Sequence, residues 1–151
     1  LNPNLEPRTR TSNPEPERRT PNPEPRTKDT IPRMSAITTH VLDTSLGRPA
    51  AGLRVVLERG GKSSEWQIVG HGETDEDGRQ RTLMADQGPL ESGLYRLVFD
   101  TRRYFEGRAV RALYPSVIIT FEVTADDGKS AAHYHIPLLL SPFGYTTYRG
   151  S

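Results

Sequence analysis

The sequence predicts an all-β protein, an antiparallel β-sandwich with one short helix, preceded by an N-terminal extension without stable structure. Three observations predict it. Short segments of alternating polar and apolar residues recur after the first 35 positions, and Gly, Pro and Asp residues separate them at short intervals. Only one brief stretch has the character of a helix. The first 33 residues differ in composition from the rest.

The N-terminal extension, residues 1–33, contains eight of the thirteen prolines and only three aliphatic side chains. An imperfect repeat begins with Asn-Pro at Asn2, Asn13 and Asn22. Such a segment buries too little apolar surface to offset the entropy lost on ordering. Recognition as a polyproline-type peptide is an alternative, but a disordered extension is the prediction. Residues 34–151 are therefore expected to form the folded domain.

The segments expected to be strands are rich in β-branched residues or alternate in polarity, and each ends at turn residues. In chain order they cover 37–43, 53–59, 66–74, 79–83, 94–99, 117–123, 133–138 and 144–148. Turns or breaks are expected at 47–49, 60–61, 75–78, 88–89 and 126–128, and the Asp-Gly pair of 75–78 favours a hairpin. The helix is expected at 101–109, before Tyr114-Pro115.

Composition excludes several classes of function. The net charge of +1, from 20 basic and 19 acidic residues, gives no basic surface for nucleic acid or an anionic membrane. The absence of Cys excludes disulfides, thiolate nucleophiles and Cys-based zinc sites. No apolar run approaches the roughly 18 residues that a membrane span needs. We therefore expect a cytoplasmic protein, with no peroxisomal signal of the usual C-terminal kind.

Two histidines near the C-terminus are the first candidates for chemistry. His133 and His135 are two residues apart, so in a strand both side chains point to one face. With His40 they could bind zinc, which accepts three imidazoles and a water. Alternatively, an imidazole with a pKa of about 6.5 is suited to general acid–base catalysis. A third interpretation makes both histidines half-exposed strand residues without a chemical role. Spacing alone leaves these alternatives open.

An arginine and the end of the chain are further candidates. Arg79 follows an Asp-Gly pair at the start of a predicted strand, where its long side chain could reach across a cleft. The chain ends in Tyr148, Arg149, Gly150 and Ser151, which supply a phenol, a guanidinium, a hydroxyl and a free carboxylate. If this end is ordered in a sheet, it offers donors for a planar, amide-rich ligand.

In these residues the sequence resembles the 5-hydroxyisourate hydrolase family, the enzymatic branch of the transthyretin-like proteins. The matching motifs lie at 38–43, 77–79, 114–115, 133–141 and 148–151. The resemblance implies a transthyretin-like sandwich of two four-stranded sheets with a short helix. It also implies a homotetramer, assembled as a dimer of dimers with active sites at the interface between dimers. The implied reaction opens the ring of 5-hydroxyisourate with water and gives 2-oxo-4-hydroxy-4-carboxy-5-ureidoimidazoline, without cofactor or metal.

The resemblance also implies site residues. His135 is the leading base, His40 is its partner or the acid, and Arg79 stabilises the oxyanion and binds substrate. Ser151 orients substrate or water, because no adjacent acid–base pair is evident to make it a nucleophile. The implied substrate-binding residues are His40, Arg79, Tyr148, Arg149, Gly150 and Ser151, and His133 would support His135. The competing hypothesis is a non-enzymatic transthyretin-like carrier of a small hydrophobic ligand.

Overall fold

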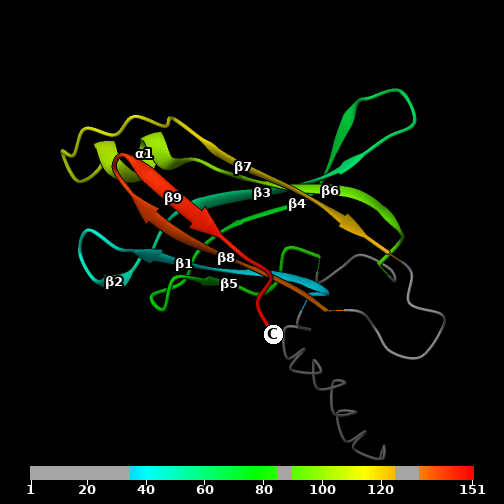
Figure 1. Ribbon diagram of the computed structural model, residues 1–151, viewed down its shortest axis with the longest axis horizontal. Coiled ribbons are helices and arrows are strands. Elements are labelled where there is room, and N and C mark those ends of the chain that lie inside the picture. The colour runs from blue at the N-terminus through cyan, green and yellow to red at the C-terminus, as the bar shows by residue number, and fades with distance from the viewer. Residues whose placement is uncertain (1–34, 85–89, 125–132) are drawn as a thin grey trace, which may run out of the picture.

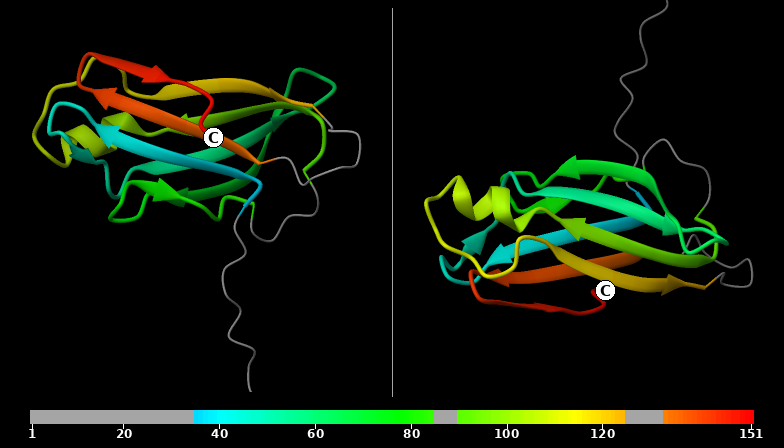
Figure 2. Two further views of the ribbon diagram at one scale, coloured as in Figure 1. Left: turned by 60° about the horizontal axis from the view of Figure 1, so that its bottom comes forward. Right: turned by 90° about the horizontal axis from the view of Figure 1, so that it is seen from above.

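The protein, described by a computed structural model over residues 35–84, 90–124 and 133–151, is a β-sandwich with one short helix (Figure 1). Figure 2 shows the two sheets as stacked layers, with the helix at the end where the β8–β9 turn lies. The extension 1–33 and the turns expected at 88–89 and 126–128 lie outside the described residues. Across the described ranges, no helix is long and apolar enough to cross a membrane.

One sheet has five strands and contains His40, Arg79 and His135. Its strands are β1 (Ile37–Asp43), β2 (Arg48–Pro49), β5 (Arg79–Gln80), β8 (Tyr134–Ser141) and β9 (Gly144–Thr147). They are ordered β2-β1-β8-β9, and β5 also pairs with β1. The other sheet, ordered β4-β3-β6-β7, contains β3 (Arg54–Gly60), β4 (Trp66–Glu73), β6 (Gly93–Phe99) and β7 (Val117–Val123).

The sandwich is confirmed, but two details differ from the expected pair of antiparallel four-stranded sheets. The residues 47–49 do not only break the first strand, because Arg48 and Pro49 fold back and pair with Asp43 and Leu42 as a fifth strand. Strands β1 and β8 run parallel from Ile37↔Tyr134 to Asp43↔Leu140. A parallel pair needs a long crossover rather than a hairpin, and here the whole four-stranded sheet lies between the two strands in sequence.

The turn at 75–78 does not form the expected hairpin. It carries the chain from β4 in one sheet to β5 in the other, where Gln80 pairs with Thr39. Gly78 has a φ of 72°, and a Cβ there would collide with the carbonyl oxygen of Val41. The turn therefore lies directly against β1, and β5 ends after two residues instead of extending to Leu83.

The core lies between the sheets, and the helix closes one end of it. Helix α1 (Thr101–Glu106) begins at Asp100, whose carboxylate accepts a hydrogen bond from the N–H of Arg103 at 3.1 Å. It is shorter than the predicted 101–109, because the chain leaves the helix at Gly107 and Ala109 has a left-handed φ of 54°. The largest fully buried side chains are those of Tyr95, Phe99, Ile37, Leu53, Leu57, Leu97, Leu138 and Leu140.

A buried polar contact fixes the helix to the site-bearing sheet. The Tyr104 hydroxyl donates to the Asp43 carboxylate at 3.0 Å, and the Arg108 guanidinium lies 3.7 Å from the centre of the Tyr104 ring. Burial and the adjacent Asp43 raise the pKa of Tyr104 to about 12. The phenol therefore stays neutral and keeps donating to Asp43 at the C-terminal end of β1.

Candidate active site

Strand β1 lies at the centre of the site because it pairs with two strands that carry the other polar groups. Thr38 lies opposite His135 of β8, and His40 lies opposite Arg79 of β5. Thr38 and His40 are two residues apart on one face of β1, whereas Ile37 on the opposite face is fully buried. The alternation of β1 therefore places a hydroxyl and an imidazole on the same outer face of the sheet.

The turn before β5 positions Arg79. One carboxylate oxygen of Asp75 accepts hydrogen bonds from the backbone N–H groups of Arg79, at 2.8 Å, and Asp77, at 3.0 Å. The other oxygen accepts from the Arg81 guanidinium at 2.9 Å. The backbone N–H of Val41 in turn donates to the carbonyl of Gly78 at 2.8 Å, which fixes the turn to β1. Asp75 thus organises both arginines.

The two histidines at the start of β8 share one face, as the sequence predicts. Tyr134 and Ile136 are buried on the other face, His135 is half-buried and His133 is exposed. The Thr38 hydroxyl lies 2.8 Å from Nδ1 of His135 and 3.0 Å from Nε2 of His133. The two rings are nearly parallel, with an interplanar angle of 11° and 6.3 Å between their centres.

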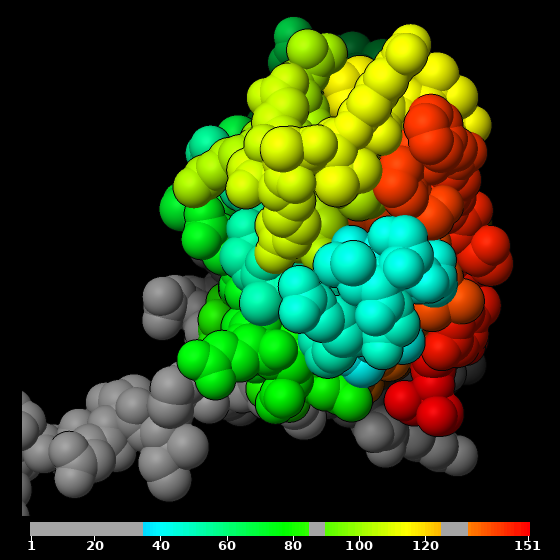
Figure 3. All heavy atoms as spheres, turned by 90° about the vertical axis from the view of Figure 1, so that its left-hand side faces the viewer, coloured from blue at the N-terminus to red at the C-terminus, as the bar shows by residue number. Residues whose placement is uncertain are grey.

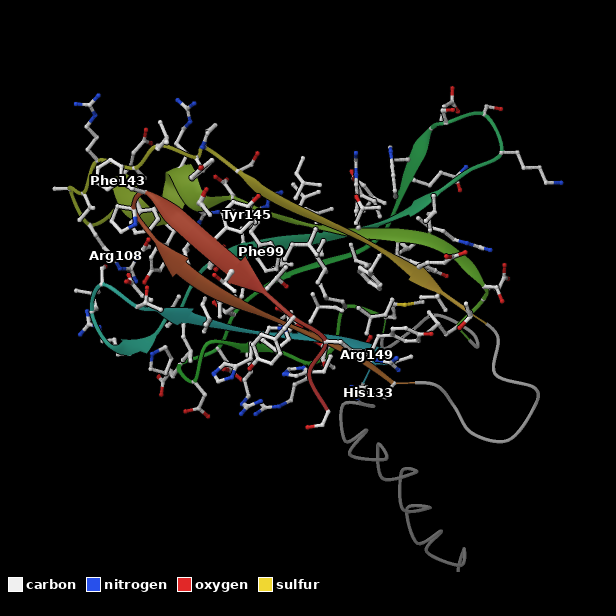
Figure 4. All side chains as sticks on the ribbon, viewed as in Figure 1. Phe99, Arg108, His133, Phe143, Tyr145 and Arg149 are labelled. Carbon is white, nitrogen blue, oxygen red and sulfur yellow. The ribbon has the colours of Figure 1, made fainter. Side chains whose placement is uncertain are left out.

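The end of the chain returns to this face. The backbone N–H of Gly150 donates to the carbonyl of His135 at 2.8 Å in an isolated antiparallel bridge. This contact directs Ser151 toward the histidines. Arg149 instead lies 5.2 Å from the centre of the Tyr134 ring, and Figure 4 labels Arg149 on the segment that follows β9. Tyr148 is 56% exposed.

These groups surround a cavity of about 140 Å³, lined by Thr38, Thr39, Arg79, Arg81, His133, His135 and Ser151. The structure therefore brings Arg79, His135 and Ser151 together. His40 is beside Arg79 but does not line the cavity, and neither do Tyr148, Arg149 and Gly150. A second cavity, of about 260 Å³ and lined by Arg54, Val56, Val98, Asp100 and Ser116, contains none of the predicted site residues.

Thr38, Thr39 and Arg81 line the cavity although the sequence did not single them out. For two of them, the alternation of side chains along a strand could have indicated a place in the site. Thr38 precedes His40 by two residues and shares its face, and Arg81 follows Arg79 by two. Thr39 precedes His40 directly, and its hydroxyl donates to the carbonyl of Ile136 at 2.6 Å. Nothing in the sequence distinguished it from other strand threonines.

The electrostatics keep the imidazoles neutral. Burial, followed by the positive charge of Arg79, lowers the pKa of His135, and neighbouring His133 and His40 act in the same direction. Burial and Arg79 also lower the pKa of His40, against smaller opposing contributions from Asp77 and Asp75. Both rings are therefore mainly unprotonated near neutral pH, which is the state that a general base requires.

Among the described residues, no group of three His, Asp or Glu side chains is placed to hold a metal ion. The polar side chains of the cavity carry imidazoles, hydroxyls and guanidinium groups. Together they can accept a proton, donate hydrogen bonds and stabilise a developing negative charge.

Comparisons with known proteins agree with this chemistry. A family model described as the HIUase/Transthyretin family matches residues 37–150. The chain is 42% identical over 118 residues to the 5-hydroxyisourate hydrolase of Mus musculus, covering 78% of this chain and 96% of the mouse protein. It is 40% identical over 115 residues to the enzyme of the same name from Salmonella typhimurium, covering 76% and 80%. It is also 44% identical over 126 residues to the uric acid degradation bifunctional protein TTL of Arabidopsis thaliana, covering 76% of this chain and 37% of that protein.

Solved structures of both branches share the fold. The 5-hydroxyisourate hydrolase of Klebsiella pneumoniae superposes with a TM-score of 0.64 at 32% identity, covering 76% of this chain and 98% of that one. Sea bream transthyretin in complex with thyroxine superposes with a TM-score of 0.69 at 27% identity, covering 77% and 95%. The architecture is therefore common to a hydrolase and to a hormone-binding protein.

Proposed function

This chain belongs to the HIUase/transthyretin family, and from that premise we propose that it hydrolyses 5-hydroxyisourate in urate degradation. The product is 2-oxo-4-hydroxy-4-carboxy-5-ureidoimidazoline. The observation that carries the proposal is the cavity in which Arg79, His135 and Ser151 meet. Relatives named for this reaction, at 40 to 42% identity over most of the chain, support the same substrate.

The geometry supports a division of roles. His135, whose pKa is lowered by burial and Arg79, takes a proton from the attacking water. Arg79 holds a permanent positive charge at the cavity and stabilises the oxyanion that forms on the ring carbonyl. The proton that His135 takes from water is the one that the departing nitrogen needs, and His40, opposite Arg79 on β1 and mainly neutral, is the partner of His135 that helps to orient the reacting groups. Ser151 orients substrate or water through its hydroxyl. No step requires a cofactor.

The carrier hypothesis has the fold in its favour but not the site. Sea bream transthyretin shares the architecture, and fold alone does not determine function. A carrier of a hydrophobic ligand needs a mainly apolar pocket with few polar groups. The cavity here has two histidines, two arginines and the C-terminal residue among its lining. This lining favours hydrolysis of a polar ring over storage of an apolar ligand.

We also propose a homotetramer, built as a dimer of dimers, with active sites where dimers meet. Exposed apolar side chains support assembly at the end of the sandwich where the β1–β2 turn, the loop before β7 and the β8–β9 turn lie together (Figure 3). Leu46, Leu113 and Phe143 of these segments are 50%, 63% and 66% exposed. His40 lies outside the cavity of one chain, so a neighbouring subunit could complete a larger pocket. Light scattering should give the mass of four chains.

The direct test uses freshly generated 5-hydroxyisourate and follows its decay with and without purified protein. The wild type should accelerate decay, and His135→Ala should lower the acceleration by about 10²- to 10⁴-fold, the usual contribution of a general acid or base. His71→Ala is the matched control, because His71 is an exposed histidine on β4 in the other sheet. Equal decay rates with and without the wild type would reject the function.

A cytoplasmic location stays a prediction from the sequence, which cell fractionation checks.

A further inference from the structure

The Thr38 hydroxyl occupies an unusual position between two imidazoles. Thr38 is 4% exposed, and its hydroxyl is within hydrogen-bond distance of Nδ1 of His135 and Nε2 of His133. Strand pairing fixes this arrangement, since Thr38 lies directly opposite His135 in the parallel β1–β8 ladder. The contact with His135 therefore follows from the strand register, and His133, just before β8, reaches the same hydroxyl from the exposed side.

A hydroxyl has one proton, so it can donate to only one of these nitrogens. For both contacts to be hydrogen bonds, at least one ring nitrogen must carry a proton and donate it to the Thr38 oxygen. If that nitrogen is Nδ1 of His135, then Nε2 of the same neutral ring has its lone pair free for a water or substrate proton. If it is Nε2 of His133 alone, Nδ1 of His135 accepts from Thr38 and Nε2 of His135 is blocked as a base.

We propose that Thr38 is a positioning residue that holds His135 with its proton on Nδ1 and connects it to the exposed His133. The inference rests on the proposed function for the role of His135 as base. In this arrangement His135 donates from Nδ1 to the Thr38 oxygen, and the Thr38 hydroxyl donates to Nε2 of His133. The exposed ring thus becomes part of the same hydrogen-bonded chain as the catalytic one.

The chain provides a path for the proton that catalysis delivers. When Nε2 of His135 takes a proton from water, the ring becomes an imidazolium. Its Nδ1 proton moves to the Thr38 oxygen while the Thr38 proton moves to Nε2 of His133. His135 is then neutral with a proton on Nε2, and His133 carries the positive charge. Reversal of both transfers makes His135 an imidazolium again, and its Nε2 can then give the proton to the departing nitrogen. No proton is gained or lost, and Thr38 ends with one proton as it began.

The surrounding charges favour this direction. Arg79 and Arg81 line the same cavity as His135, and Arg79, His133 and His40 all lower the pKa of His135 by their charge. Ser151 also lines this cavity, and among the described residues no Asp or Glu does. A positive charge left on half-buried His135 is therefore costly, whereas exposed His133 is solvated by water.

The first test is nuclear magnetic resonance of the ¹⁵N-labelled full chain without substrate, which reports the protonated nitrogen of each histidine. In the wild type, neutral His135 should carry its proton on Nδ1. Thr38→Val, which removes the hydroxyl while keeping the shape, should remove this preference, and Thr38→Ser should restore it. Thr44→Val is the control, because Thr44 uses its hydroxyl on the Leu140 carbonyl at 3.1 Å, beyond the other end of β1. A proton on Nε2 of neutral His135 in the wild type would overturn the proposal.

The second test is kinetic. Thr38→Val should lower kcat about 10- to 100-fold with a much smaller change in KM, since the hydroxyl orients the base rather than binding substrate. Thr38→Ser should recover most of the rate, and the Thr44→Val control should keep the wild-type rate. His133→Ala should also lower kcat, and the double variant should be no slower than Thr38→Val alone because both changes break one chain. Additive losses, or an unchanged kcat in Thr38→Val, would refute the connection. A wild type without hydrolase activity would reject the proposed function, while the tautomer of His135 would still decide the role of Thr38.

Discussion

Gly150 offers the sharpest single substitution in the site. Its N–H donates to the carbonyl of His135, and it has no side chain at a point where the terminus crosses the imidazole. A Cβ on Gly150 would overlap Cδ2 of His135 and lie 3.2 Å from both Cγ of His135 and Cγ of Pro137. Ordinary carbon–carbon contacts are about 3.5–4.0 Å, so Gly150→Ala has to move the ring or the terminus by on the order of 1 Å.

Either movement displaces His135 or Ser151 from the cavity. A misplacement of about 1 Å can cost about 100-fold in rate, so we expect Gly150→Ala to lower kcat/KM for 5-hydroxyisourate by about that factor. The thermal midpoint should change little, because Gly150 pairs with the sheet only through an isolated bridge. Gly144→Ala is the matched control, since the first atom that its Cβ would meet, Oγ of Ser141, is 3.7 Å away. Wild-type turnover in Gly150→Ala would refute the view that this close contact sets the site geometry.

Three more predictions follow from the same site. The lowered pKa of His135 places the acidic limb of the activity profile below about pH 6.5. Arg79→Gln removes a positive charge that opposes protonation of His135, so it should shift this limb to higher pH as well as slow turnover. An unshifted limb would contradict the effect of Arg79 on the pKa of His135. A tag added after Ser151 should impair turnover more than the same tag at the N-terminus, because Ser151 lines the cavity, and equal rates for the two tagged proteins would remove Ser151 from the site. Deletion of residues 1–33 should leave kcat/KM unchanged, since the residues that line the cavity lie between Thr38 and Ser151; loss of activity would assign the extension a role.

The strands could be predicted from the sequence because their signal is local. Segment 37–43 coincides with β1 and segment 117–123 with β7, since alternation with period two requires only neighbouring residues. The pairing of strands, in contrast, is not determined by neighbouring residues in the sequence. The parallel contact of β1 with β8 joins residues about a hundred positions apart, and the turn at 75–78 has the composition of a hairpin although it connects two sheets. The position of this turn depends on the close contact of Gly78 with Val41, and no short sequence pattern indicates that contact.

The site was predictable to the extent that its residues carry chemistry of their own. His135, Arg79 and Ser151 are recognisable as a base, a cation and a terminal carboxylate, and they meet at one cavity. Thr38 was overlooked because a threonine in a strand is ordinarily explained by its β-branched shape. Its importance comes from the register that places it between two imidazoles. Arg149 is the reverse case. Its charge suggested that it lines the pocket, but its guanidinium lies over the Tyr134 ring.

The parallel neighbour of β1 follows it in sequence only after all four strands of the other sheet. During synthesis, the strand that carries Thr38 and His40 emerges before the other described strands and must wait for those four before its partner exists. A ribosome that stalls before β8 would release a chain lacking both a central strand and the imidazoles next to it. Such truncated chains would be unstable as well as inactive. Proteases that degrade unfolded protein would therefore remove them.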